Sequence, residues 1–394
     1  LTGGLSALSA NAANGVYVVE DIALDATAGS ATEAKSIALS QGYERAFQAL
    51  VRKLIPQNDR VKVPVLSSKD ALAYILDISL SAERSSAVRY IAKMTVRFKE
   101  SQTRSLLRRS GAAIAETTSK PVLVLPIQNQ AGASLLWEDG NQWRAAWGGV
   151  GAGNGLVPLT LPLGDLEDIT MVDAQGALAG HDGLWNLASK YGSSDVFLSI
   201  AEVTNQGAAA KLSAVRVGRF GEGRTYQLDV TKNEGESSMQ MLTRAAMTLD
   251  NSLQLDWQHA NLLQFGVERQ ILVEVPISGL QDWVLVNNRL QGVPAINRMN
   301  TRSINRDQVR LDVYFSGDER QLSLALAQKD LALFLNESSI WELSILNKPK
   351  AQEGLSLPAQ EGTTILNQEP VVDEVSVPAQ EINLNGDNTN VPAE

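Results

Sequence analysis

One continuous apolar run, residues 121–127, limits the possible folds of this chain more than any other feature; it reads Pro-Val-Leu-Val-Leu-Pro-Ile. A strand with one face in solvent alternates apolar and polar residues, whereas this run has no polar face. We therefore expect a central strand covered on both faces. The segments that follow have the order β-α-β-α-β-β-β-α, which predicts a mixed sheet with packed helices over residues 118–266. After the central strand they are a Trp-bearing helical stretch, strand 157–163, helix 184–191, strands 195–203, 211–217 and 225–230, and a helix from 238 to about 263.

A smaller α+β domain is predicted before this sheet, over residues 14–117. The Ser30-Ala-Thr-Glu33 segment has the capping-box pattern and predicts a long helix that ends before Pro56. Ser68 is expected to cap a short helix over 71–76, polar residues 83–86 to form a hairpin turn, and Gly111 to end a helix over 101–110. The plainest half-buried strand in the chain follows that turn, with alternating apolar residues Val88, Tyr90, Ala92, Met94, Val96 and Phe98.

A third domain is predicted over residues 267–347. Its segments follow the order β-α-β-β-α-β, the split-βαβ or ferredoxin-like arrangement. They are a strand over 271–275, a helix over 280–290, two strands, a helix over 319–328 and one final strand near Ile345. The fold class expected for the whole chain is therefore α+β, built from three small mixed domains.

The two ends differ from this body in composition. Residues 1–13 are small and uncharged, and Ala10-Asn11-Ala12 fits the small-x-small rule of secretory cleavage sites. We expect a signal-peptide remnant there, with cleavage after Ala12 or Ala13. Residues 348–394 are rich in Pro, Gln, Asn and acids and hold no aromatic residue, which predicts a disordered acidic tail. A tether for a partner and a plain solvating extension both remain open for this tail.

Composition excludes several kinds of function. The chain has no cysteine, so disulfides, thiolate metal sites, a cysteine nucleophile and a lipid-modified cysteine are ruled out. The formal net charge is -10, and the tail holds eight acids against two lysines, so the folded body is close to neutral. Nucleic acid is therefore not expected as a partner, because binding to phosphates needs an excess of Lys and Arg. No run approaches the roughly 20 apolar residues of a membrane-spanning helix.

Several short segments, taken in order, resemble one known family. They are the export-type end, the first helix–hairpin unit, and the segments 120–127 (KPVLVLPI), 155–168 (GLVPLTLPLGDLED) and 191–198 (YGSSDVFL). Over about residues 16–346 the chain resembles the proteobacterial "domain of unknown function 2066" family. The resemblance implies a periplasmic location and no assigned activity. More loosely, the middle domain resembles the N-terminal domain of the Tol system's propeller protein, and the first two domains resemble a flagellar ring protein. Those proteins bind other envelope proteins, although function does not follow from fold.

Tryptophans and a glycine-rich run form the first candidate site. Trp137, Trp143 and Trp147 precede or adjoin the run 148–155, which includes Gly151 and Gly153. The run does not match a phosphate-binding loop, because Asn154 breaks the G-x-G-x-x-G spacing and no strand precedes it. Tryptophan is enriched at interfaces, so a partner surface is one interpretation and core packing is the other.

An acidic cluster forms the second candidate site. Asp165 and Asp168 lie with Glu167 and Asp173 after an expected strand. Paired carboxylates can perform acid–base catalysis or bind a cation, but Asp165 and Asp168 also have the positions of helix-start residues. The two histidines, His181 and His259, are far apart in sequence and have no thiolate to complete a metal site.

The sequence therefore predicts a non-enzymatic periplasmic interaction or assembly module of the bacterial cell envelope, with other envelope proteins as partners and without a cofactor or metal. A periplasmic binding protein for a small or lipidic ligand is the alternative, and a hydrolase with a carboxylate-based site is the third possibility. An enclosed apolar cavity would favour the ligand-binding protein. Titratable groups that converge in a cleft would favour the enzyme. An exposed apolar patch or an unpaired sheet edge would favour the interaction module.

Overall fold

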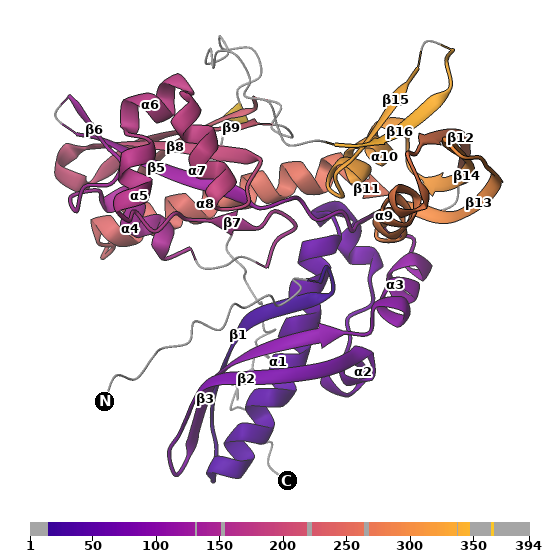
Figure 1. Cartoon of the computed structure of the whole chain (residues 1–394). Coiled ribbons are helices and arrows are strands. Elements are labelled where there is room, and N and C mark those ends of the chain that lie inside the picture. Colours follow the sequence, from indigo (N-terminus) through magenta and orange to yellow (C-terminus); the bar gives the residue numbers. More distant parts are fainter. Residues whose placement is uncertain are drawn as a thin grey trace, which may run out of the picture.

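The computed structural model describes residues 15–130, 132–150, 154–218, 223–263, 268–336, 338–346 and 364–365. Helices and mixed sheets build these parts, so the predicted α+β class is confirmed. Figure 1 shows three sheet-bearing bodies, coloured indigo, magenta and orange in chain order. The expected signal-peptide remnant lies outside the described residues, and so does the acidic tail except for β17 (Thr364–Ile365). In the ranges above, no helix is long and apolar enough to cross a membrane.

The first body is an antiparallel sheet in the order β1 (Val18–Thr27), β3 (Arg89–Phe98), β2 (Ile75–Ser85). The alternation predicted for β3 is confirmed from Tyr90 to Phe98, where every second residue is buried, but Val88 precedes the strand and is 45% exposed. Helix α1 (Ala31–Leu54) lies across that face. Its Gly42 permits the close approach, since a Cβ there would fall 2.5 Å from Leu24 and 2.8 Å from Met94. The other helices of this body are α2 (Ser68–Tyr74), α3 (Glu100–Arg109) and the 3-10 helix Gln57–Lys62.

The helix ends of this body differ from prediction in detail. Ser30 caps α1 by accepting the Glu33 N–H, but the Glu33 carboxylate accepts from Gly29 rather than from Ser30. Ser67 caps α2, one residue before the expected Ser68. Residues 83–85 belong to β2, so the hairpin turn is shorter and later than predicted. Gly111 ends α3 in a left-handed conformation, φ +73°, as predicted.

The second body is a seven-stranded mixed sheet in which the path β17-β10-β9-β8-β5-β6 is extended by β7 on β5. The predicted covered strand is confirmed as β5 (Val122–Gln130). Its side chains alternate between two cores: Val122 and Val124 contact the layer of α4 and α8, and Leu123 and Leu125 contact α6 and α7. The remaining elements of this body are β6 (Ala133–Leu135), α4 (Gln142–Gly148), β7 (Leu159–Thr160), α5 (Leu166–Met171), α6 (Ala174–Ala179), α7 (Asp182–Lys190), β8 (Asp195–Thr204), the 3-10 helix Asn205–Gly207, β9 (Ala209–Gly218), β10 (Thr225–Thr231) and α8 (Ser238–Ala260).

One predicted strand of this body is wrong in extent. The strand expected over 157–163 is reduced to β7, because the chain then turns through Gly164, φ +73°, into α5. Helix α5 begins at the helix start that Asp165 and Asp168 indicate, whereas α6 is not predicted from the sequence; both occupy the connection to α7.

The third body is a five-stranded sheet in the order β13-β14-β12-β16-β15, with α9 and α10 packed on it. The predicted order holds through α10, but the chain then forms two strands where one was expected. The second, β16, pairs with β12 in parallel, so β15 becomes the edge of the sheet and the ferredoxin-like pattern is extended by a hairpin. The elements are β12 (Glu268–Pro276), α9 (Leu280–Gln291), β13 (Ile296–Ile304), β14 (Gln308–Ser316), α10 (Glu319–Ala327), β15 (Leu331–Leu335) and β16 (Trp341–Ile345).

The bodies are joined by packing and hydrogen bonds. A two-stranded ladder of β4 (Ile114–Ala115) and β11 (Leu262–Leu263) connects the exits of the first two bodies, and one hydrophobic core runs through both. The Trp257 indole on α8 donates to the Thr117 carbonyl at 2.7 Å. Lys120 pairs with Asp330 and ties the start of β5 to the third body.

Candidate functional site

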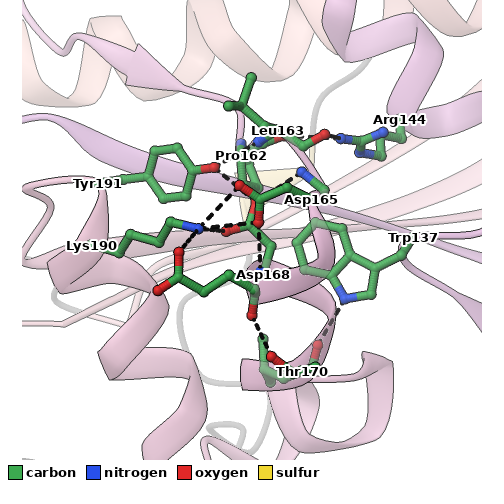
Figure 2. Close-up of polar contacts among 12 residues, drawn as sticks. Trp137, Arg144, Pro162, Leu163, Asp165, Asp168, Thr170, Lys190 and Tyr191 are labelled. Atoms are coloured by element: carbon green, nitrogen blue, oxygen red, sulfur yellow. Dashed lines mark hydrogen bonds and ion pairs between the residues drawn. The ribbon is translucent and has the colours of Figure 1, made fainter.

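The acidic cluster of the second body is organised around Asp168 (Figure 2). Asp165 caps α5 by accepting the Asp168 N–H at 2.9 Å. The Asp168 carboxylate is fully buried and accepts from the Gly164 N–H, the Tyr191 hydroxyl and the Lys190 ammonium, each at 2.8 Å. The capping interpretation of Asp165 is thus confirmed, and each named partner of Asp168 is a donor that stabilises the charged carboxylate.

Lys190 bridges the three carboxylates of the cluster. Its ammonium lies 2.8 Å from Glu167 and Asp168 and 3.1 Å from Asp165. Hydrogen bonds to Asp168 and Glu167 raise the pKa of Lys190 above its ordinary value. Burial alone raises the pKa of Asp168, but the bonds from Lys190, Tyr191 and Gly164 outweigh burial and hold this pKa below its usual range. A general acid or base needs a pKa near the working pH, so the described geometry favours a structural clamp.

The neighbouring polar contacts fix loops to the same region. The Trp137 indole donates to the Val172 carbonyl at 2.7 Å. The Arg144 guanidinium donates to the Pro162 and Leu163 carbonyls at 2.9 and 2.7 Å, as Figure 2 shows, and lies over the Trp137 ring. Trp137 is therefore a half-buried member of this clamp.

Two of the tryptophans proposed for a partner surface are core residues, and that interpretation is wrong for them. Trp143 has no exposed surface and its indole donates to the Ser199 carbonyl at 3.1 Å; Trp147 is 5% exposed. The physical reason is their spacing of four, which places both on the face of α4 that packs between β5 and α8. Their rings stack edge to face, 5.8 Å apart.

The glycine-rich run is anchored at its end. Gly151 and Gly153 lie outside the described residues. Asn154 forms two hydrogen bonds with the backbone of Glu20, at 2.5 and 2.6 Å, at the bulge of β1. The segment after the glycines therefore ties the second body to the first.

The remaining ionisable candidates do not converge. His181 and His259 are both exposed, one before α7 and one in the last turn of α8. Among the residues that the structure describes, no group of three or more His, Asp or Glu side chains could hold a metal ion. The alternative of a cation bound by the acidic cluster therefore gains no support from the geometry of these residues.

An open groove of about 800 Å³ lies between α3 and the third body. Its walls are mostly charged and polar, whereas a binding protein for a lipidic ligand needs an enclosed apolar cavity. The charged lining residues include both signs: Glu100, Arg104, Arg108 and Glu268.

In the described part of the chain, the edge strand β15 pairs on one side only and leaves its other side uncovered. The strand reads Leu-Ala-Leu-Phe-Leu, without charge, proline, glycine or bulge, and within that part it pairs with β16 alone. Phe334 is 43% exposed and Leu335 is 54% exposed. In Figure 1 the β15–β16 hairpin projects from the third body. Such an edge presents unpaired main-chain donors and acceptors beside apolar side chains.

Three of the other long edge strands in the described residues are blunted. β1 has a bulge and three acidic residues, and Asn154 covers part of it. β2 has two register shifts and carries Asp77, Glu83 and Arg84. β13 has two register shifts and carries Arg298 and Arg302. Bulges and charges are the devices by which natural proteins prevent strand addition, and β15 has neither.

Sequence analysis missed this edge. The pattern predicts one final strand that ends near Ile345 after the helix over 319–328, and it does not separate residues 331–335 as a strand of their own. A signal was present: an uncharged apolar run lies between Asp330 and Asn336, both common in turns. The run could not be assigned to an edge, because strand order depends on residues far away in sequence.

Comparison with known proteins found no matching family model, no matching curated protein and no matching solved structure. The resemblance described above therefore remains an expectation, and the site rests on the geometry of this chain.

Proposed function

We propose that this chain is a non-enzymatic interaction and assembly module of the bacterial cell envelope, which binds another polypeptide by adding its strand to the edge of β15. One observation carries the proposal: β15 is an edge strand without charge or bulge, whereas the edge strands β1, β2 and β13 carry both. The clamped, fully paired state of Asp165 and Asp168 removes support from the carboxylate-based hydrolase.

The chemistry of the partner follows from the strand. Main-chain hydrogen bonds supply much of the affinity in strand addition, and alternating side chains supply specificity. A matching segment would be extended and uncharged over about five residues, with apolar side chains against Leu335 on one face and Phe334 on the other. A charged residue in that segment would lose hydration without gaining a partner, since β15 carries no charge.

The periplasmic location is part of the same proposal. The Ala10-Asn11-Ala12 segment and the family resemblance support it. Fractionation of cells that make the full natural protein, with sequencing of its mature N-terminus, tests it. Cleavage after Ala12 or Ala13 is the expected result, and recovery of the uncleaved protein in the cytosol would overturn the location.

A photo-reactive amino acid placed at Phe334 tests the docking edge in cells. A covalent product with another polypeptide is expected on irradiation. The control position is Ile304, which is 54% exposed against 43% for Phe334 and lies at the end of the blunted edge β13. Products of equal yield from both positions, or none from Phe334, would contradict the proposal.

A further inference from the structure

The sequence of β15 is nearly symmetric about its centre. Leu331 and Leu335 lie equally far from Leu333, and so do Ala332 and Phe334. When a strand meets its own copy antiparallel with Leu333 at the centre, each Leu331 faces a Leu335 and each small Ala332 faces a large Phe334. No charged residue lies within the pairing, so like charges do not oppose it.

The backbone has the phase that this pairing requires. The Asn336 N–H donates to the Ile340 carbonyl at 2.9 Å, and the Leu346 N–H donates to the Asp330 carbonyl at 2.9 Å. Because antiparallel ladders alternate, the even-numbered residues of β15 point their N–H and C=O toward β16. Leu331, Leu333 and Leu335 therefore point theirs outward, at the free edge.

The centred register uses all of these outward groups. Leu333 exchanges two hydrogen bonds with its own copy, and each of the two Leu331–Leu335 pairs exchanges two more. A shift of two residues in either direction leaves outward groups at the ends unmatched. Two identical β15 edges therefore satisfy all of their outward groups in this one register. The sequence of an unrelated strand would not be constrained to the same symmetry about Leu333.

We propose that the strand added to β15 belongs to a second copy of this chain, related by a two-fold axis at Leu333. The inference rests on the proposed function, since it names the partner of the same edge. The two five-stranded sheets then form one ten-stranded sheet. The pairing covers the exposed Leu335 side chain with Leu331 of the copy and sets Phe334 against its Ala332.

Disulfide formation between two variants tests the register, because the chain has no cysteine of its own. One variant carries Ala332→Cys and the other Phe334→Cys. In the centred register these positions form a non-hydrogen-bonded pair with Cα atoms about 4.5 Å apart, within the range of a disulfide. Two copies of the same variant place their cysteines about 8 Å apart, which is too far.

Mild oxidation of the mixture is therefore expected to give a disulfide-linked dimer, and oxidation of either variant alone is expected to leave monomers. A size tag on one variant identifies the mixed product. Equal dimer yield from Phe334→Cys alone would overturn the centred register. A mixture that yields no more dimer than the single variants would overturn pairing of β15 with its copy.

Sedimentation of the protein without cysteines gives an independent measurement. Leu335→Pro removes an outward N–H and leaves the bonds to β16 intact, so dimer affinity is expected to fall about tenfold or more. Ile304→Pro is the matched control, with the same exposed fraction at the other edge of the same sheet, and should leave affinity unchanged. Equal effects of both variants, or a parent protein that stays monomeric, would overturn the inference.

The photo-crosslink at Phe334 separates the two proposals. A product with twice the mass of the chain supports both. A product with a different polypeptide supports strand addition and overturns the second copy as the partner. No product overturns strand addition itself, and the second copy with it.

Discussion

Trp143→Ala distinguishes a core residue from an interface residue at a position where the sequence permits both. The ring is fully buried between β5 and α8, and its indole N–H donates a hydrogen bond to the Ser199 carbonyl. A buried Trp removes about 150–250 Å² from water, which at roughly 25 cal/mol per Å² corresponds to about 4–6 kcal/mol. Measured truncations of buried aromatic residues are near about 3–5 kcal/mol, and we expect a loss of that size in the free energy of unfolding.

Urea unfolding followed by circular dichroism measures this loss, since it does not depend on the fluorescence of the replaced residue. The midpoint should fall while the slope stays constant, because the surface exposed on unfolding changes little. Trp143→Phe, which keeps an aromatic ring and loses the hydrogen bond, should lose about 1–2 kcal/mol. This milder variant keeps the measurement interpretable where the alanine variant does not fold.

Phe334→Ala is the matched aromatic truncation at the edge of β15. Its ring is 43% exposed, so the free energy of unfolding should change by about 1 kcal/mol or less. The affinity of β15 for the strand that is proposed to pair with it should fall instead. A Trp143→Ala variant with the stability of the parent, or a Phe334→Ala variant with the larger loss, would refute the assignment of core and edge.

Two further predictions concern buried charges. Arg216 and Asp195 form a buried ion pair at 2.7 Å, so Arg216→Met should cost about 3–5 kcal/mol by breaking this pair. The losses of Arg216→Met and Asp195→Leu should be less than additive in the double variant, because both remove the same pair. Urea midpoints of the single and double variants check this, and additive losses would contradict it. Hydrogen bonds from Lys190, Tyr191 and Gly164 hold the pKa of Asp168 below its usual range despite burial. The stabilising contribution of this carboxylate is therefore present above the pKa of an unfolded Asp, about 3.9, and is lost as the pH falls through the folded-state pKa. The unfolding midpoint of Asp168→Asn should therefore approach that of the parent as the pH is lowered from 6 to 3, and a gap that widens would refute this sign.

Local patterns predicted the elements that bury one or two whole faces. The run at 121–127 predicted a covered strand, and β5 sends successive side chains into two cores. The alternation in β3 predicted its buried face for the same reason. In both strands the local pattern of apolar residues alone indicates which faces are buried, so the prediction does not depend on residues far away in sequence.

The candidate site was harder to predict, because its contacts join residues far apart in sequence. The capping pattern at Asp165 was visible, but Lys190 and Tyr191 reach the cluster only after α6 and α7 fold against it. The spacing of Trp143 and Trp147 could have indicated one buried face of a helix. The edge position of β15 depends on β16 crossing to pair with β12, a choice that no local pattern in residues 331–335 contains.

Self-pairing at β15 also limits the size of the assembly. A two-fold contact uses the same strand in both copies, so each dimer has no second β15 edge left for a further copy. Among the other long edges in the described residues, β1, β2 and β13 carry bulges and charges that oppose addition. The outer side of β10 pairs with β17 at Tyr226 and Gln227, and β10 carries the charged Asp229 beyond them. Growth into an open fibre, the hazard of an uncharged apolar edge, is therefore blocked once two copies meet. Under this proposal, any larger assembly uses a different surface of the dimer, and the side-chain pairing of Phe334 with Ala332 can be tested without disturbing that surface.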